Sequence, residues 1–188
     1  MTTSLAAWGW MGMITFYQYP NFQGNSFSAH DDVFRMSAVD ANFSWQDRIS
    51  SCVITDDAWI VYKDSEYRGG SAYLPPGRYP DGDAMRIGGD VMSSARRVPY
   101  YTDPDPWILL FRDANYNGTV RVVGEDLPSM NTWNDSVTSI IVTRGTWQLF
   151  ADANYKGTQW ILGPGQYSNS DAAGIRNDTV SSLRIIGR

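Results

Sequence analysis

Four short segments of the chain carry carboxylate and hydroxyl oxygens at the same spacing. The hexapeptides NDSVTS (134–139) and NDTVSS (177–182) lie in the C-terminal half, and QDRISS (46–51) and GDVMSS (89–94) lie in the N-terminal half. The second residue is Asp and the last is Ser in all four hexapeptides. Carboxylate, hydroxyl and carbonyl oxygens are the ligands that hard cations such as calcium prefer. The hexapeptides are therefore candidate cation-binding loops.

One hexapeptide is too short to surround an ion, so a second one would have to complete the coordination shell. Calcium takes about 6–8 oxygen ligands and tolerates irregular geometry. The alternative is that the hexapeptides are only turns before strands, because Asn, Asp, Ser and Thr often bond nearby backbone groups. We favour cation loops for the C-terminal pair. Both interpretations stay open for the N-terminal pair, where Gln46 and Gly89 replace the first Asn.

Each hexapeptide belongs to a repeat that opens with two aromatic residues separated by four others, followed by one residue and a glycine. The four copies are YQYPNFQG from Tyr17, YKDSEYRG from Tyr62, FRDANYNG from Phe111 and FADANYKG from Phe150. An apolar run precedes each copy and an alternating run follows it, which predicts a β-hairpin with a folded loop. The glycines at 24, 69, 118 and 157 are expected to have positive φ, and the paired rings are expected to pack together.

The four repeats are predicted to pair into two β-sandwich domains. Each repeat has the pattern of four strands, and a single four-stranded unit cannot bury both of its faces. Three prolines between the second and third repeats, Pro99, Pro104 and Pro106, indicate an extended linker. The predicted organisation is a leader at 1–12, domain 1 at 13–98, a linker at 99–106 and domain 2 at 107–188.

Composition and charge argue against several classes of function. The formal net charge is −5 and no Lys/Arg-rich run occurs, so we expect no binding of nucleic acid or of an anionic membrane surface. No apolar run approaches the ~20 residues of a membrane helix. No basic residue precedes Arg35, so no signal peptide is expected, and the protein would be cytoplasmic or non-classically secreted. Cys52 is the only cysteine, which excludes an intrachain disulfide, and its apolar neighbours predict a buried, inert thiol.

The hairpin motif and the hexapeptide together resemble the βγ-crystallin superfamily, specifically its calcium-binding microbial and invertebrate branch. The resemblance covers about residues 13–187 and rests on four hairpins in phase with four hexapeptides. It implies an all-β fold of two Greek-key β-sandwich domains, each built from two four-stranded motifs. It also implies a non-enzymatic calcium-binding protein with a structural or stress-related role.

The resemblance further implies a double clamp, in which each ion is shared by both hexapeptides of a domain and takes a carbonyl from the residue after the first hairpin aromatic. In domain 2 the implied ligands are Asp135, the Ser136 carbonyl, Thr138, Asp178, the Thr179 carbonyl and Ser181, with the hairpin carbonyls of Arg112 and Ala151. In domain 1 they are Asp47, the Arg48 carbonyl, Ser50, Asp90, the Val91 carbonyl and Ser93, with the hairpin carbonyls of Gln18 and Lys63.

Calcium is expected to act as a stabilising ion that bridges paired loops. With one or two carboxylates per ion, the affinity should be micromolar or weaker. Domain 1 should bind more weakly than domain 2, because it lacks the first Asn of the hexapeptide and supporting groups orient metal ligands. Calcium ions are the expected partners, and the protein is expected to be a monomer or weak dimer.

Two rival functions stay open at this stage. An enzyme would need a nucleophile beside the single histidine, His30, and the chain has no Gly-x-Ser-x-Gly elbow. Paired acids such as Asp31 and Asp32 are compatible only with a glycosidase, which needs two well-placed carboxyl groups. A protein- or carbohydrate-binding module, like an inhibitor or a toxin, with calcium incidental, would need an exposed aromatic patch. The candidates for that patch are Tyr100, Tyr101, Trp107, Trp147 and Trp160.

Overall fold

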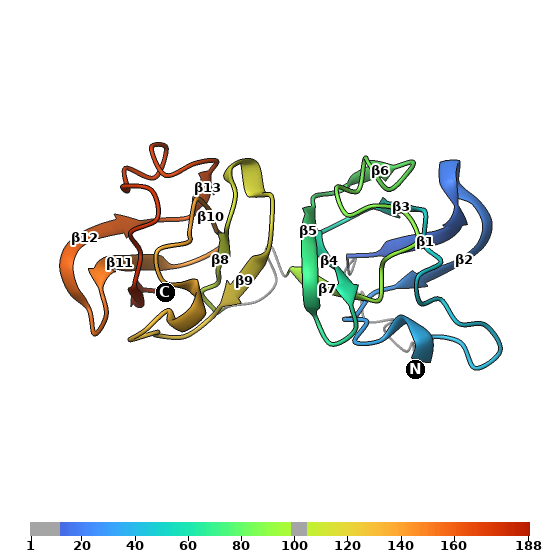
Figure 1. The fold of residues 1–188 in the computed structure, drawn as a ribbon, viewed down its shortest axis with the longest axis horizontal. Coiled ribbons are helices and arrows are strands. Elements are labelled where there is room, and N and C mark those ends of the chain that lie inside the picture. Colours follow the sequence, from blue (N-terminus) through green and yellow to red (C-terminus); the bar gives the residue numbers. More distant parts are fainter. Residues whose placement is uncertain (1–11, 99–104) are drawn as a thin grey trace, which may run out of the picture. The chain divides into compact units, whose positions relative to one another are not determined.

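A computed structural model describes residues 12–98 and 105–188, and its regular elements are β-strands and short 3₁₀ turns (Figure 1). The described residues divide into two compact units: unit 1 contains 12–68 and 74–98, and unit 2 contains 69–73 and 105–188. Most of the predicted leader and linker, with Trp8, Trp10, Tyr100 and Tyr101, lies outside the described residues. Within the described ranges, no helix is long and apolar enough to cross a membrane.

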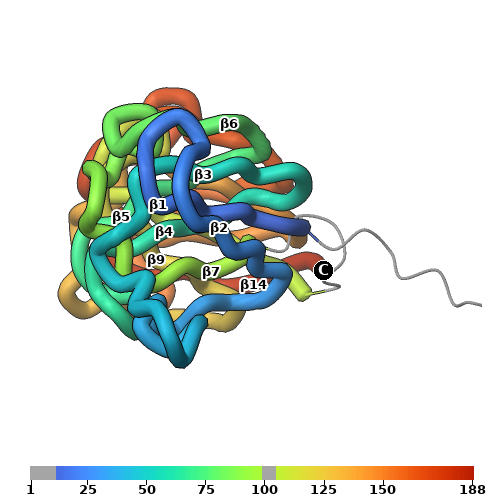
Figure 2. Tube along the Cα trace, turned by 90° about the vertical axis from the view of Figure 1, so that its right-hand side faces the viewer, coloured from blue at the N-terminus to red at the C-terminus, as the bar shows by residue number. Residues whose placement is uncertain are grey.

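The N-terminal half forms two sheets. Its described strands are β1 (Ile14–Tyr19), β2 (Gln23–Ala29), β3 (Ser51–Ile54), β4 (Ala58–Asp64), β5 (Arg68–Leu74), β6 (Gly77–Tyr79) and β7 (Ser94–Val98), with 3₁₀ turns η1 (Pro20–Phe22) and η2 (Met36–Ala38). The strand orders are β2-β1-β3-β6 and β5-β4-β7. Figure 2 shows β1 between β2 and β3, and both of these pairs are antiparallel.

The C-terminal half repeats this arrangement. Its described strands are β8 (Ile108–Phe111), β9 (Val120–Val123), β10 (Ser139–Val142), β11 (Thr146–Asp152), β12 (Lys156–Leu162), β13 (Gly165–Tyr167) and β14 (Ser182–Gly187), with 3₁₀ turns η3 (Ala114–Tyr116) and η4 (Asn131–Trp133). The strand orders are β13-β10-β8-β9 and β12-β11-β14. The first sheet of each half thus contains one strand contributed by the following repeat.

This exchange of the third strand is the Greek-key feature of the fold. β6 pairs with β3 through Cys52 and Tyr79, and β13 pairs with β10 through Ile140 and Tyr167. In the opposite direction, single bridges join Val33 to Ala95 and Leu127 to Leu183. The prediction of two Greek-key β-sandwich domains is confirmed. The third strands of the first and third repeats, however, are reduced to these bridges, because the chain soon enters the turns η2 and η4.

The folded hairpins have the predicted geometry in all four repeats. The φ angles of the glycines are +79° at Gly24, +76° at Gly69, +71° at Gly118 and +77° at Gly157. The paired rings lie 5.6–5.7 Å apart between centroids; the pairs are Tyr17–Phe22, Tyr62–Tyr67, Phe111–Tyr116 and Phe150–Tyr155. Three of these pairs pack edge to face and the Tyr62–Tyr67 pair is tilted. The rings cover the bend of each hairpin, and the glycine supplies backbone angles that a side chain would strain.

The core of each unit is built mainly of apolar side chains. In unit 2, Trp147 is fully buried among aliphatic residues from both sheets, such as Ile108, Leu149 and Leu183. Cys52 of unit 1 is also fully buried, and this burial raises the pKa of its thiol to about 12. The predicted burial of Cys52 is therefore confirmed, and its raised pKa disfavours the reactive thiolate.

Candidate metal sites

Backbone hydrogen bonds hold each hexapeptide against the hairpin of its own repeat. In every copy the N–H of the fifth residue donates to the carbonyl of the first hairpin aromatic. The bonds are Ser50 to Tyr17 at 3.1 Å, Ser93 to Tyr62 at 3.0 Å, Thr138 to Phe111 at 2.9 Å and Ser181 to Phe150 at 2.9 Å. The fifth-position hydroxyl is thereby held beside the residue that follows the aromatic, which is the residue predicted to supply a carbonyl ligand.

A second set of backbone bonds joins the two hexapeptides of each half. The Asp47 N–H donates to the Met92 carbonyl at 3.2 Å, and the Asp90 N–H donates to the Ile49 carbonyl at 3.1 Å. In the C-terminal half the Asp135 N–H donates to the Val180 carbonyl at 3.3 Å. Each acceptor belongs to a fourth-position residue whose side chain is buried in the core. The core therefore fixes the two loops side by side.

The aspartate at the second position has a left-handed backbone in all four hexapeptides. The φ angles are 54° at Asp47, 52° at Asp90, 50° at Asp135 and 51° at Asp178. Asp and Asn tolerate this region better than other residues with a side chain. The repeated Asp thus has a conformational role in addition to its carboxylate, a role that its position in the sequence did not indicate.

The hydroxyl of one hexapeptide meets the carboxylate of the other. The contacts are Ser50 Oγ to Asp90 Oδ1 at 2.7 Å, Ser93 Oγ to Asp47 Oδ1 at 3.0 Å, Thr138 Oγ1 to Asp178 Oδ1 at 3.5 Å and Ser181 Oγ to Asp135 Oδ1 at 3.3 Å. We call these four contacts the crossed pairs. In the first of them, Ser50 Oγ also lies 2.9 Å from the Gln18 carbonyl oxygen. Three predicted ligands, on three separate segments, therefore meet at Ser50.

The donor chemistry of the crossed pairs fits a hard cation. Each pair supplies one carboxylate and one hydroxyl, and calcium accepts such oxygens in irregular arrangements. Among the described residues, no group of three or more His, Cys, Asp or Glu side chains could hold a metal ion. A site here would therefore depend on hydroxyl and carbonyl oxygens as well as on carboxylates, and it would lack the nitrogen or sulfur ligands that zinc prefers.

The remaining predicted ligands are backbone carbonyls, and their role stays a prediction. They belong to Arg48, Val91, Ser136 and Thr179 in the hexapeptides and to Lys63, Arg112 and Ala151 in the hairpins. The Ser136 and Thr179 hydroxyls bond carbonyls of their own loops, at Asn134 and Arg176 respectively. The Arg112 guanidinium lies 4.9 Å from the centre of the Trp133 ring and donates to the Thr132 carbonyl, so it holds the hairpin to the segment before the hexapeptide.

The last serine of each hexapeptide has a role that sequence reasoning missed. Its buried hydroxyl donates to a carbonyl inside the folded hairpin: Ser51 to Tyr19, Ser94 to Asp64, Ser139 to Asp113 and Ser182 to Asp152, at 2.6–2.7 Å. The same oxygens accept the N–H of the second hairpin aromatic, in Phe22, Tyr67, Tyr116 and Tyr155, at 3.0–3.1 Å. The presence of Ser at this position in all four copies could have indicated this role, which is to close the hairpin.

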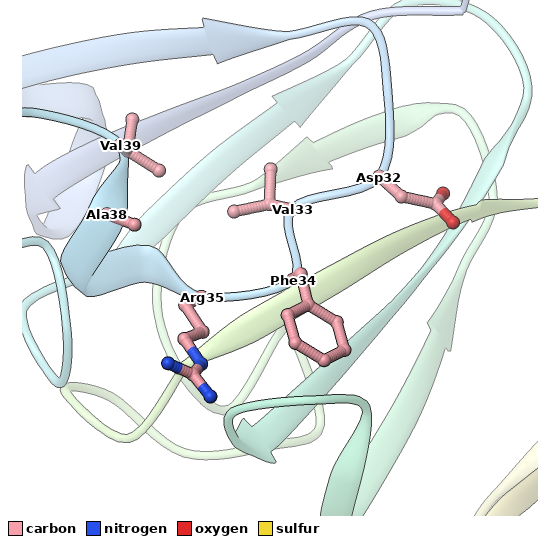
Figure 3. Close-up of a pocket in the computed structure, with 6 residues that line it drawn as sticks. All are labelled: Asp32, Val33, Phe34, Arg35, Ala38 and Val39. Carbon is pink, nitrogen blue, oxygen red and sulfur yellow. The ribbon is translucent and has the colours of Figure 1, made fainter.

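An open hollow in unit 1 is lined by Asp32, Val33, Phe34, Arg35, Ala38 and Val39 (Figure 3). Asp32 accepts the Arg97 N–H at 2.8 Å and pairs with the Arg96 guanidinium, while Arg35 pairs with Glu66. The charged groups of the hollow are therefore engaged in contacts that hold the fold. The lining contains no histidine, cysteine, serine or threonine, and its one carboxylate, Asp32, is engaged by Arg96 and by the Arg97 N–H.

The tryptophans considered for a binding module differ in burial. Trp147 is buried in the core of unit 2, and Trp107 and Trp160 are partly buried. Trp160 packs against the same core as Trp147. His30, considered for an enzyme, is exposed at the end of β2. These positions give the tryptophans a packing role.

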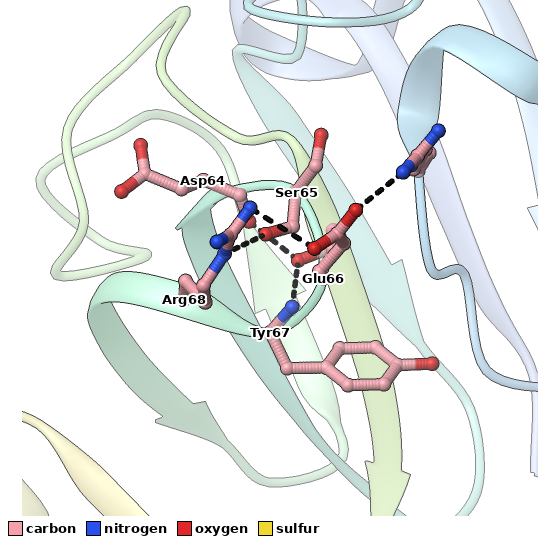
Figure 4. A network of polar contacts seen from close by, with 7 residues as sticks. Asp64, Ser65, Glu66, Tyr67 and Arg68 are labelled. Carbon is pink, nitrogen blue, oxygen red and sulfur yellow. Dashed lines mark hydrogen bonds and ion pairs between the residues drawn. The ribbon is translucent and has the colours of Figure 1, made fainter.

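Glu66 joins two arginines at the second hairpin (Figure 4). Its φ is 65°, whereas the other three hairpins have Asn at this position. A left-handed glutamate is disfavoured, and the ion pairs with Arg35 and Arg68 hold it in place. The hydrogen bond from Arg35 and the charge of Arg68 lower the pKa of Glu66.

A lowered pKa makes the contribution of Glu66 depend on pH. The contribution is present above the ordinary pKa of the carboxyl group and is lost as the pH falls through the lowered value. Between about pH 5 and 3, the wild-type protein should lose more free energy of unfolding than the Glu66→Gln variant. Urea unfolding across this range checks the difference, with Glu125→Gln as the control. Equal acid sensitivity of the wild type and Glu66→Gln would contradict the assigned cause.

Comparisons with known proteins identify the family. The Beta/Gamma crystallin family model matches residues 13–98 and 107–186. Gamma-crystallin D of Rattus norvegicus is 31% identical over 179 residues, which cover 94% of this chain and 98% of that protein. The structure of Geodin, a beta-gamma crystallin from Geodia cydonium, is 19% identical with a TM-score of 0.57, covering 93% of this chain and 99% of Geodin.

Protein S, whose solution structure is of a complex with calcium, is 18% identical with a TM-score of 0.39, covering 93% of this chain and 99% of that one. The family match extends over both halves of the chain and all four hairpins. The resemblance found in the sequence is therefore confirmed, and the chain belongs to the Beta/Gamma crystallin family.

Proposed function

We propose that this protein is a non-enzymatic calcium-binding crystallin with a structural role, in which the ion joins the paired hexapeptides of a domain and stabilises it. The crossed pairs carry the proposal, because each brings a hydroxyl and a carboxylate from different loops within 2.7–3.5 Å. An ion held between such groups bonds both loops at once. The proposed domains span residues 13–98 and 107–188.

The proposed ligands are those named from the sequence, and the crossed pairs group them into sites. One site of domain 2 combines Thr138 with Asp178, and the other combines Ser181 with Asp135. In domain 1 the groups are Ser50 with Asp90 and the Gln18 carbonyl, and Ser93 with Asp47. Water would complete a shell of about 6–8 oxygens, so the affinity should be modest.

Calcium would stabilise the fold by mass action. An ion that binds only the folded state adds RT ln(1 + [L]/Kd), which is about 2.7 kcal/mol at a hundredfold excess over Kd. Such a contribution is a large part of the 5–15 kcal/mol that is typical for the stability of a domain.

Thermal unfolding of the full chain in calcium and in chelator tests this proposal. We expect saturating calcium to raise the Tm of the wild type by about 10 °C. Asp135→Ala and Asp178→Ala should each lose a large part of this shift. Asp171→Ala, which removes an exposed carboxylate of unit 2 outside the crossed pairs, should keep the wild-type shift. A wild-type melting curve that is unchanged by calcium would refute the proposed function.

A further inference from the structure

In the C-terminal half, the first residue of each hexapeptide donates a hydrogen bond to the aspartate that follows it. The Asn134 Nδ2 donates to Asp135 Oδ2 at 2.7 Å, and the Asn177 Nδ2 donates to Asp178 Oδ2 at 2.8 Å. We infer that these two amides are positioning residues that orient the ligand carboxylates, so that the C-terminal sites load with calcium before the N-terminal ones. This inference rests on the proposed function.

The amide bond determines which carboxylate oxygen faces the site. In both hexapeptides the asparagine occupies Oδ2, and Oδ1 faces the hydroxyl of the partner hexapeptide. A neutral donor leaves the carboxylate charged, and it limits rotation of an exposed side chain that would otherwise have to be ordered by the ion. Groups that orient a metal ligand in this way typically change metal affinity by about 10–100-fold when they are removed.

The N-terminal half cannot make the same contact at Asp90, because Gly89 has no side chain. At both of its crossed pairs the hydroxyl and the carboxylate approach more closely than in the C-terminal half: 2.7 Å and 3.0 Å, against 3.5 Å and 3.3 Å. An arriving ion must therefore replace a short hydroxyl–carboxylate hydrogen bond in the N-terminal half. Both features lower the expected calcium affinity of that half.

The structure has space for a substitution that would introduce this contact into the N-terminal half. A Cβ added at Gly89 would meet no atom within 4 Å, and Gly89 is not among the residues with positive φ. The Cβ of an asparagine therefore fits at this position without a positive φ or a close contact. Gly89→Ala adds the Cβ without the amide and is a matched control for Gly89→Asn.

Calorimetric titration of the full chain with calcium tests the inference in two directions. In the wild-type background, Asn134→Ala should weaken a C-terminal site about tenfold or more while leaving the Tm in chelator close to the wild-type value. In an Asp135→Ala, Asp178→Ala background, the remaining heat reports the N-terminal half. There Gly89→Asn should tighten binding by about tenfold, and Gly89→Ala should leave it unchanged.

The outcomes separate this inference from the proposed function. A wild-type chain that gives no calcium-dependent heat refutes both. A wild-type chain that binds, with an Asn134→Ala variant of unchanged affinity and a Gly89→Asn variant no better than Gly89→Ala, refutes the positioning role alone. If Asn134→Ala also unfolds at a lower Tm in chelator, and this loss of stability is as large in free energy as the loss of calcium binding, the residue acts in folding. That result would also refute the positioning role.

Discussion

Replacing Gly118 with valine is expected to destabilise unit 2 by about 3–5 kcal/mol. The φ of Gly118 is +71°, a region that β-branched side chains rarely adopt. A Cβ at this position would also meet the carboxylate of Asp113, with 2.9 Å to its Cγ. Backbone strain and displacement of Asp113 therefore add to each other. Both affect the folded hairpin that holds the fifth-position hydroxyl of its repeat.

The neighbouring Asn117→Val variant is the matched control. The φ of Asn117 is −97° and its ψ is 175°, an extended conformation that suits valine. The substitution removes the hydrogen bond from the Asn117 amide to the Ala114 carbonyl, at a cost of about 1 kcal/mol. Urea unfolding followed by tryptophan fluorescence gives both values. Similar losses for the two variants would show that the left-handed glycine is not what closes this hairpin.

The hairpins could be predicted from the sequence because their determinants are local. An aromatic pair five residues apart, such as Phe150 and Tyr155, and a glycine two residues further on, Gly157, define a bend whose geometry depends on a single short segment. Four copies of the motif then specified the number of repeats, and the need of each unit to bury both faces specified the pairing of repeats. Each step used residues that are close together in the chain.

The crossed pairs could not be predicted in this way, because they join residues that are far apart in the chain. Thr138 and Asp178 are 40 residues apart, and Asp135 and Ser181 are 46 residues apart. Sequence reasoning required a second hexapeptide to complete the shell, but the identity of the facing atoms depends on strand exchange between repeats. The left-handed backbone at Asp135 also determines where its carboxylate points, and the residue type alone permits other conformations.

The third strands of the first and third repeats were also not predicted correctly from local sequence. The sequence pattern predicts four strands per repeat, yet Val33 and Leu127 contribute only single bridges. Backbone bonds to other partners follow at once: the Met36 N–H donates to the Ser93 carbonyl, and the Met130 N–H donates to the Ser181 carbonyl. These bonds hold the segment against the hexapeptide of the partner repeat, so the chain leaves the sheet where it begins to support the candidate site.

Replacing Ser182 with alanine is expected to destabilise unit 2 by about 2–5 kcal/mol, with or without calcium. The buried hydroxyl donates to the Asp152 carbonyl at 2.7 Å and accepts the Tyr155 N–H at 3.0 Å. Alanine leaves both backbone groups without this partner, at about 1–3 kcal/mol for each group that stays buried and unpaired. The hairpin between β11 and β12 should then open more readily, and the Ala151 carbonyl, a proposed ligand, lies in that hairpin.

Ser168→Ala is the control, because the Ser168 carbonyl, which accepts the Asn115 N–H, is kept by alanine. Urea unfolding in chelator should place this variant within about 0.5 kcal/mol of the wild type. Hydrogen exchange at Tyr155 should accelerate in Ser182→Ala, because its N–H loses the acceptor. If Ser182→Ala unfolds like the wild type in chelator and differs only in calcium, the last serine acts through the ion, and the hairpin-closing role assigned to all four copies is wrong.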